Sequence, residues 1–217
     1  FEAFHGFILI HDDIMDGATT RRGKDAVHVA FEKYTPHGQW AGMLLGDYMS
    51  SATNEYVAKN VPELADIFYE MQKFLFVGQY YELLHWGKDV SVDVSERIEY
   101  FKSAQYTFMY PLQIGLALGG GARHMLDEYS RYAGLCFQMQ NDWMDVADGE
   151  SGKDKGLDAQ NGVPNVVQMI LEENDGDRDK TRGEVAKRLE EYREKAIGEL
   201  EKAELGEEQR GQLVGIV

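Results

Sequence analysis

Apolar side chains recur at three- and four-residue spacings along almost the whole chain, and this period constrains the fold more than any other feature. Phe4, Phe7 and Ile8 show it near the start, and Val185 followed by Leu189 shows it near the end. A helix of about 3.6 residues per turn places such side chains on one face, whereas strands require strict alternation, which is scarce here. The pattern therefore predicts an all-α fold.

Turn-forming residues divide the chain into seven predicted helices. We expect these helices at residues 1–16, 39–59, 62–86, 93–120, 125–148, 163–174 and 182–204. No internal repeat and no domain-separating linker is visible in the sequence, so residues 1–217 are predicted to form one large single-domain helical bundle. The chain begins at Phe1 within an expected helix and stops at Val217 without a terminal cap, so we expect it to be truncated at both ends.

Three carboxylates end the first predicted helix. Asp12 and Asp16 project from one face about 5–6 Å apart, with Asp13 beside them. Carboxylates at a helix C-terminus repel one another and oppose the helix dipole, so they need a compensating cation. Mg²⁺ is a suitable one, since it binds carboxylates together with substrate phosphates, which Arg21 and Arg22 would also bind. The alternative is that the aspartates pair with these arginines across a turn.

A second polar stripe repeats this arrangement near the end of another predicted helix. Its members lie at spacings i, i+3, i+4 and i+7 and share one face: Gln138, Asn141, Asp142 and Asp145. A glycine-rich loop with Lys153 and Lys155 follows. Two acidic helix ends with trailing cations predict a cavity in which metal ions bridge to a diphosphate, while Arg and Lys neutralise the remaining charge.

Charge and cysteine content exclude several classes of protein. The formal net charge is −16, with 38 acidic and 22 basic residues, whereas nucleic-acid binding needs concentrated Lys and Arg, so we expect no nucleic-acid partner. No stretch reaches ~18 uninterrupted apolar residues, so we expect no stable membrane insertion. Cys136 is the single cysteine, which excludes a disulfide framework and favours a reducing, cytoplasmic location.

Together the motifs resemble those of the trans-isoprenyl diphosphate synthases, all-α enzymes that make geranyl, farnesyl and geranylgeranyl diphosphate. "DDIMD" followed by "RRG" is similar to their first aspartate-rich motif, "FQMQNDWMD" to the second, and "GKDKGLD" to the loop after it. Between them "LLGDYM", "GQYYE" and "KSAQYTFMYP" follow in the family's order. The resemblance runs from Phe1 to about Asn165. It implies the isoprenoid synthase fold, a helical bundle around a central cavity, and a homodimer.

The resemblance also implies roles for individual residues. It implies that about three Mg²⁺ ions are held by oxygen ligands from both stripes: Asp12, Asp13, Asp16, Asn141, Asp142 and Asp145. Arg21, Lys102 and Lys153 match contacts to the allylic diphosphate, and His5 and Arg22 match contacts to isopentenyl diphosphate. Gln138 matches a residue facing the reacting carbons, so the catalytic candidates are Lys102, Gln138 and Lys153.

The implied reaction condenses the two diphosphates. The allylic diphosphate ionises, the double bond of isopentenyl diphosphate attacks the carbocation, and proton loss gives a product five carbons longer. Positioning and charge stabilisation carry such a reaction, in an apolar chamber. In this family the residues one and two turns before the first aspartates limit product length, and Phe7 and Phe4 there imply about C15 to C20. Alternatively, both rings are plain core aromatics.

The sequence departs from the family at three points. Asn141 stands where the family usually has Asp, although an amide oxygen also coordinates Mg²⁺. Val163 and Asn165 replace the usual Lys and Thr, and the upstream Gly-Lys-x-Arg segment is absent. These departures keep a non-catalytic subunit of a heteromeric synthase as an alternative.

Two further classes share parts of the pattern. Glu2-x-x-His5 and Glu82-x-x-His85 are typical of di-iron helical bundles, but that class leaves both aspartate stripes unexplained. A class I terpene cyclase shares the first aspartate motif. Its second motif would have Ser and Glu where this chain has Asp145 and Gly149.

Overall fold

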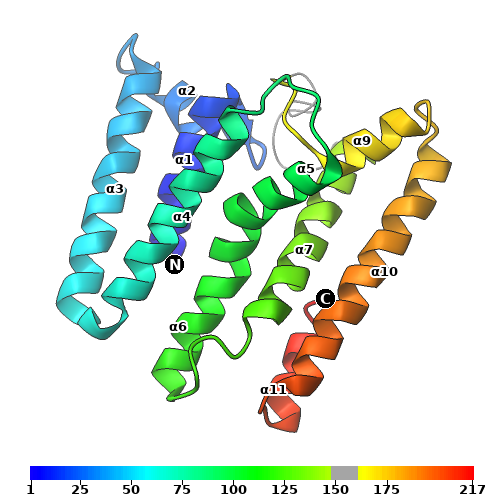
Figure 1. Cartoon of the computed structure of the whole chain (residues 1–217). Helices are drawn as coiled ribbons and strands as arrows, with labels where there is room; N and C mark the ends of the chain where they lie inside the picture. The colour runs from blue at the N-terminus through cyan, green and yellow to red at the C-terminus, as the bar shows by residue number, and fades with distance from the viewer. Residues whose placement is uncertain (148–160) are drawn as a thin grey trace. The chain divides into compact units, whose positions relative to one another are not determined.

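The computed structural model describes residues 1–147 and 161–217, and most of them are helical (Figure 1). The predicted all-α class is confirmed. Residue contacts group the chain into two compact units, the first containing residues 1–65 and Asn161, the second residues 66–147 and 162–217. Among the helices described, none is long and apolar enough to cross a membrane.

The first unit is built on two long helices. Its elements are α1 (Glu2–Asp16), β1 (Thr20–Arg21), β2 (Lys24–Asp25), α2 (Val27–Phe31), α3 (Gly38–Asn60) and the 3₁₀ turn η1 (Pro62–Leu64). α3 packs against α1 and α2. The buried glycines Gly38, Gly42 and Gly46 recur every fourth residue on α3. A methyl group at Gly46 would lie 2.3 Å from Nε2 of His11, so this glycine makes room for the His11 ring of α1.

A short hairpin follows α1, where the sequence predicts only a loop. β1 and β2 pair antiparallel, with Thr20 opposite Asp25 and Arg21 opposite Lys24. The two residues between them, Arg22 and Gly23, have φ angles of 54° and 73°. Two consecutive positive φ angles are what a two-residue type I′ hairpin turn requires. The hairpin reverses the chain and brings Arg21 back to the end of α1.

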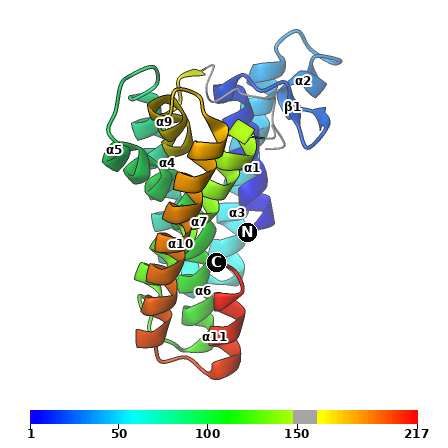
Figure 2. The ribbon, with the colours of Figure 1, turned by 90° about the vertical axis from the view of Figure 1, so that its right-hand side faces the viewer.

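The second unit is a helical assembly. Its elements are α4 (Ala65–Leu83), α5 (Val92–Glu99), the π-helical η2 (Tyr100–Met109), α6 (Tyr110–Gly119), α7 (Asp127–Ala147), α9 (Val166–Glu173), α10 (Arg178–Lys202) and α11 (Glu207–Val214). α7 packs against η2 and α10, and α11 folds back beside the end of α10 (Figure 2). The hydroxyl of Tyr129 on α7 donates to the carbonyl of Leu213 at 2.8 Å, which ties α11 to the unit.

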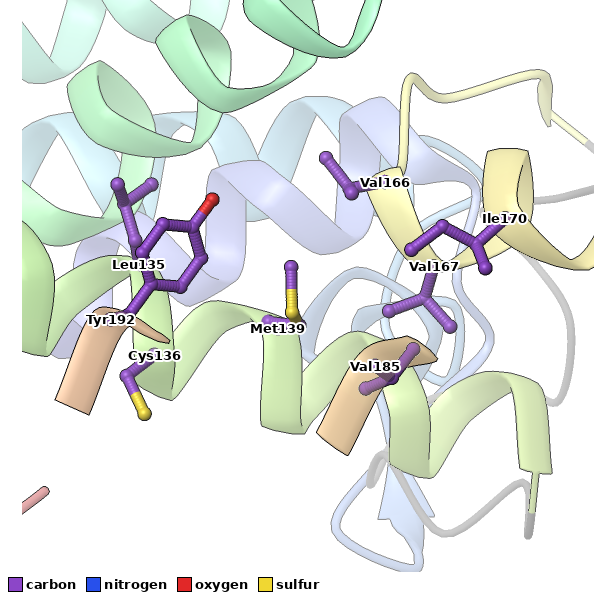
Figure 3. Packing of buried hydrophobic residues seen from close by; sticks show 8 residues of the cluster. All are labelled: Leu135, Cys136, Met139, Val166, Val167, Ile170, Val185 and Tyr192. Carbon is purple, nitrogen blue, oxygen red and sulfur yellow. The ribbon is translucent and has the colours of Figure 1, made fainter. Parts of the chain in front are cut away.

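One apolar cluster fixes the part of α7 that carries the second polar stripe. It gathers side chains of α7, α9 and α10, as Figure 3 shows: Leu135, Cys136, Met139, Val166, Val167, Ile170, Val185 and Tyr192. Each large apolar side chain buried in this way contributes about 1.5–3 kcal/mol. Asp142 follows Met139 by three residues and lies on the same, buried side of α7.

The predicted helices differ from the observed ones mainly in one long helix, which contains a π-helical stretch, and in the start of another. The expected helix 93–120 is observed as α5, η2 and α6 in unbroken succession, and α10 begins earlier than expected. Asp177 explains that start, because its carboxylate accepts hydrogen bonds from the backbone of Asp179 and Lys180, at 3.0 Å each. The sequence prediction missed the short helices α2 and α11.

Candidate active site

The three aspartates at the end of α1 are buried. Asp12, Asp13 and Asp16 are only 7, 2 and 5% exposed. Arg21 returns on the hairpin, where its Nε donates to Oδ1 of Asp13 at 2.8 Å and its Nη2 donates to Oδ2 of Asp12 at 3.0 Å and to Asp13. The structure therefore shows Arg21 paired with two of these aspartates, as the across-the-turn alternative describes.

The charge state of this cluster follows from its contacts. Burial alone disfavours a charged guanidinium. The hydrogen bonds with Asp13 and the negative charge of Asp12 outweigh that penalty and raise the pKa of Arg21 above its ordinary value. Arg21 is thus a permanently charged cation at the place where the sequence predicts that a cation is needed.

Two of the last carbonyl groups of α1, those of Asp13 and Asp16, also accept hydrogen bonds. Gly17 has a φ of 71°, and its N–H and that of Ala18 both donate to the carbonyl of Asp13. Nδ2 of Asn161 donates to the carbonyl of Asp16 at 2.8 Å. Asn161 comes from far along the chain and was missed by the sequence prediction, because no local pattern marks such a contact.

The candidates for binding isopentenyl diphosphate interact electrostatically. Arg22 is exposed in the hairpin turn, and His5 on α1 is half-buried. Burial lowers the pKa of His5, and the positive charge of Arg22 lowers it further. The structure thus brings this predicted pair within electrostatic reach in the first unit.

The two phenylalanines that the resemblance connects with product length pack together. Phe4 and Phe7 are each 1% exposed, and their rings meet edge to face with centroids 5.0 Å apart. Phe7 also meets the ring of His11 at 5.8 Å. They are core aromatics of α1, which is compatible with both interpretations given above.

Lys102 is held by Glu82, to which the sequence analysis gives a role only in the di-iron alternative. Its Nζ donates to both carboxylate oxygens of Glu82, at 2.8 and 2.9 Å, and Nε2 of Gln79 donates to Oε1 of Glu82 at 3.1 Å. Nδ1 of His85 lies 2.7 Å from the carbonyl of Tyr81. Glu82 and His85 therefore turn to other partners, which argues against the di-iron class.

The second polar stripe lies on α7 as predicted. Nε2 of Gln138 donates to Oδ1 of Asp142 at 2.7 Å, and Asp142 is 5% exposed, whereas Asn141 and Asp145 are half-buried. A further buried carboxyl, Glu99 of α5, was missed by the sequence prediction. Its burial, and then the charge of Asp142, raise the pKa of Glu99 well above its ordinary value.

The chemistry of these side chains fits Mg²⁺, which prefers hard oxygen ligands. Within residues 1–147 and 161–217, no three His, Cys, Asp or Glu side chains are grouped so as to hold a metal ion by themselves. Mg²⁺ sites usually combine one or two protein carboxylates with water and substrate phosphates. Lys153 and the loop "GKDKGLD" lie outside the described residues.

A solved structure places the fold in a known class. The fold is similar to that in the crystal structure of geranylgeranyl pyrophosphate synthase from Corynebacterium glutamicum, complexed with isoprenyl diphosphate and magnesium. The match covers 99% of this chain and 75% of the chain in that structure. The TM-score is 0.84 at 23% sequence identity. The chain thus has the all-α isoprenoid synthase fold.

Sequence comparison gives the family. The profile described as Polyprenyl synthetase matches residues 1–203. The chain is 31% identical over 195 residues to a short chain isoprenyl diphosphate synthase of Methanothermobacter thermautotrophicus, covering 83% of this chain and 57% of that protein. It is 32% identical over 178 residues to a geranylgeranyl diphosphate synthase of Methanosarcina mazei, covering 76% and 53%. The chain belongs to the polyprenyl synthetase family, and it spans about half the length of these relatives.

Proposed function

We propose that the chain forms the catalytic region of a trans-prenyl diphosphate synthase, which joins an allylic diphosphate to isopentenyl diphosphate. The family supports this function, and one structural observation carries it. Asp12 and Asp13 are buried carboxylates in contact with Arg21, a cation able to bind phosphate. Such a cluster places negative ligands and a phosphate-binding group side by side.

The family resemblance and the oxygen-rich side chains support a Mg²⁺-dependent reaction. Bound Mg²⁺, about three ions in this proposal, would supply positive charge that stabilises the departing diphosphate. Two sets of residues would hold it: Asp12, Asp13 and Asp16 on α1, and Asn141, Asp142 and Asp145 on α7.

The cationic residues would bind the substrates. Arg21, together with Lys102 and Lys153, would neutralise the allylic diphosphate, since guanidinium and ammonium groups form strong charge-assisted bonds with phosphate oxygens. His5 and Arg22 would bind isopentenyl diphosphate. Gln138 would face the reacting carbons and, through its bond to Asp142, stay oriented.

We also propose a short product of about C15 to C20 and a cytoplasmic homodimer. The buried, bulky rings of Phe4 and Phe7 support the short product, because they fill the space one and two turns before the aspartates. The homodimer rests on the resemblance alone, and light scattering of the full-length protein measures it directly.

One experiment tests the reaction. The full-length protein is incubated with Mg²⁺, labelled isopentenyl diphosphate and dimethylallyl, geranyl or farnesyl diphosphate, and the labelled product is sized. We expect elongation that is lost on chelation of Mg²⁺ and in the Asp12→Asn variant. The variant Lys33→Met, at an exposed ion pair with Asp25, is the control and should keep full activity. Absence of elongation with every primer would contradict the proposal and favour the non-catalytic subunit or the cyclase.

A further inference from the structure

We propose that the segment Gly78–Glu82 of α4 positions Lys102, and that Glu82 is a positioning residue acting through this lysine. This inference rests on the proposed function, in which Lys102 binds the allylic diphosphate. Both residues belong to the second unit. The sequence motif "GQYYE" thereby acquires a physical role.

The side-chain contact is close and shielded from water. Both oxygens of Glu82 accept from the Lys102 ammonium, at 2.8 and 2.9 Å. The Glu82 side chain is 4% exposed and the Lys102 side chain 21%. An ion pair in such surroundings is screened little by solvent, so it restricts a flexible four-carbon side chain far more than a surface pair would.

A neighbouring amide orients the carboxylate itself. Gln79 lies three residues before Glu82 on α4, and its Nε2 donates to Oε1 of Glu82 at 3.1 Å. This contact fixes the plane of the carboxylate, because a buried carboxylate adopts the orientation in which its oxygens accept hydrogen bonds from the available donors. Gln79 and Glu82 thus form a short chain of contacts that ends at Lys102.

The same segment also fixes the backbone of Lys102. A methyl group at Gly78 would lie 2.8 Å from the backbone nitrogen of Lys102 and 2.7 Å from the carbonyl carbon of Phe101. Backbone atoms cannot move aside as a flexible side chain can. Gly78 therefore allows α4 to touch η2 at the residue whose side chain Glu82 holds.

η2 is held from α7 as well. A methyl group at Gly134 of α7 would lie 2.2 Å from Cβ of Ala104. The π-helical turn that carries Lys102 thus has close backbone approaches to two helices. π-helical segments are rare in proteins. Where they do occur, they often lie at functional sites and set the direction of particular side chains. Backbone and ammonium of Lys102 are consequently both defined before any ligand binds.

A buried ion pair contributes little to the free energy of unfolding, so stability does not explain why Glu82 and Lys102 are paired, whereas positioning does. Desolvation cancels much of the attraction between buried charges. Glu82 also neutralises part of the charge with which Lys102 would attract a diphosphate, so a mere counter-charge would weaken substrate binding. A preorganised cation, by contrast, raises kcat because it is already aimed where negative charge develops.

The test measures kcat and KM for the allylic substrate in a double-mutant cycle. We expect Glu82→Gln to lower kcat about 10- to 100-fold while the KM for isopentenyl diphosphate stays within twofold. In the Lys102→Met background the same change should alter kcat by less than twofold, since Glu82 acts through Lys102. Gln79→Met should give a smaller loss of kcat, about two- to tenfold.

Matched controls separate positioning from folding. Glu70 also lies on α4 and pairs with Arg123, although its side chain is 39% exposed, so Glu70→Gln removes an ion pair from the same helix and should leave kcat unchanged. Circular dichroism melting of each variant measures folding. If Glu82→Gln does not fold, Glu82→Asp, which keeps the charge on a shorter side chain, and Gln79→Met provide the same comparison.

The outcomes distinguish this inference from the proposed function. If the wild-type chain elongates its primer and Glu82→Gln changes kcat by less than twofold, or lowers only the allylic KM, the positioning role is wrong. If the wild-type chain does not elongate, calorimetric titration with inorganic pyrophosphate and Mg²⁺ replaces the kinetics. Glu82→Gln should then weaken binding at least fivefold when Lys102 is present and leave it unchanged in Lys102→Met. Equal binding by wild type and Glu82→Gln would overturn the inference.

Discussion

Arg21 donates from Nε to Oδ1 of the buried Asp13 at 2.8 Å, which makes this guanidinium the internal cation of the aspartate cluster. Its side chain is 18% exposed and that of Asp13 only 3%. Removing one partner of such a pair leaves a buried charge without its counter-ion, which typically costs about 3–5 kcal/mol.

We therefore expect Arg21→Met to lower the free energy of unfolding by about 3–5 kcal/mol, measured by urea denaturation. Added Mg²⁺ should recover part of the loss if the aspartates bind it, because a ligand of the folded state stabilises that state. Lys33→Met, at the exposed pair with Asp25, is the control, with an expected change below about 1 kcal/mol. A metal-independent loss in Arg21→Met would contradict metal binding by these aspartates.

The close contact between α1 and α3 predicts the effect of a small change at Gly46. Gly46→Ala places a methyl group 2.3 Å from Nε2 of His11, whose ring also lies 3.1 Å from the carbonyl of Met43. We expect the substitution to lower the free energy of unfolding by about 1–3 kcal/mol, measured by thermal or urea denaturation. Gly198→Ala on α10 meets nothing within 4 Å and should instead stabilise by about 0.5–1 kcal/mol. Equal stabilities of the two variants would show that the His11 ring moves aside at little cost.

The lowered pKa of His5 predicts how this residue titrates. Burial, and then the charge of Arg22, lower the pKa of the imidazole below 6.5, so His5 is neutral at pH 7. Because the unfolded chain takes up this proton more readily, the contribution of His5 to stability is present above the unfolded pKa and is lost as pH falls through the folded pKa. Nuclear magnetic resonance titration of the His5 ring should show the low pKa in the free protein.

Two changes should raise the pKa of His5, whereas a control substitution should not change it. Arg22→Gln should raise the pKa of His5, and so should added isopentenyl diphosphate, whose negative charge favours imidazolium. Lys33→Met, in the exposed pair with Asp25, should leave it unchanged. If the pKa of His5 is the same with and without isopentenyl diphosphate, its proposed role in binding that substrate is wrong.

Glu99 gives a pH-dependent prediction of opposite sign. Its burial and the neighbouring charge of Asp142 raise the pKa of this carboxyl. A raised carboxyl pKa favours the folded state fully below the unfolded pKa, and this contribution is lost as pH rises through the folded pKa. Glu99→Gln should therefore have a higher urea midpoint than the wild type at pH 8, and the two should converge near about pH 4. A lower midpoint for Glu99→Gln at pH 8 would show that the ionised carboxylate is stabilised.

Local patterns were enough to predict the long helices and the two carboxylate stripes. Helical period placed Asp12 and Asp16 on α1, and Asp142 on α7, because residues four apart share a face irrespective of the rest of the fold. The same reasoning left two partners open for the aspartates. A spacing of residues states that a cation is needed near Asp13, but it does not state whether that cation is Arg21 or a metal ion.

The unpredicted contacts join residues that are distant in sequence. Glu82 meets Lys102 across two helices, and Asn161 reaches the carbonyl of Asp16. Neither contact has a sequence period. The π-helical η2 was predicted as ordinary helix, since widening a helix by one residue per turn shifts the side-chain directions without changing which residue types occur.

Phe4 and Phe7 give the prediction that best separates a chain-length floor from an ordinary core. Both rings are 1% exposed and meet at 5.0 Å. If they limit the growing chain, Phe4→Ala and Phe7→Ala should each shift the product to greater length, and the double variant should shift it furthest.

Either change also removes a buried ring and is expected to cost about 3–5 kcal/mol of stability, so products are compared at a temperature where circular dichroism shows the variants folded. Phe68→Ala, which removes another buried ring from α4, is the matched control and should lose stability without lengthening the product. Products of unchanged length from folded Phe4→Ala and Phe7→Ala would show that these rings serve the core alone.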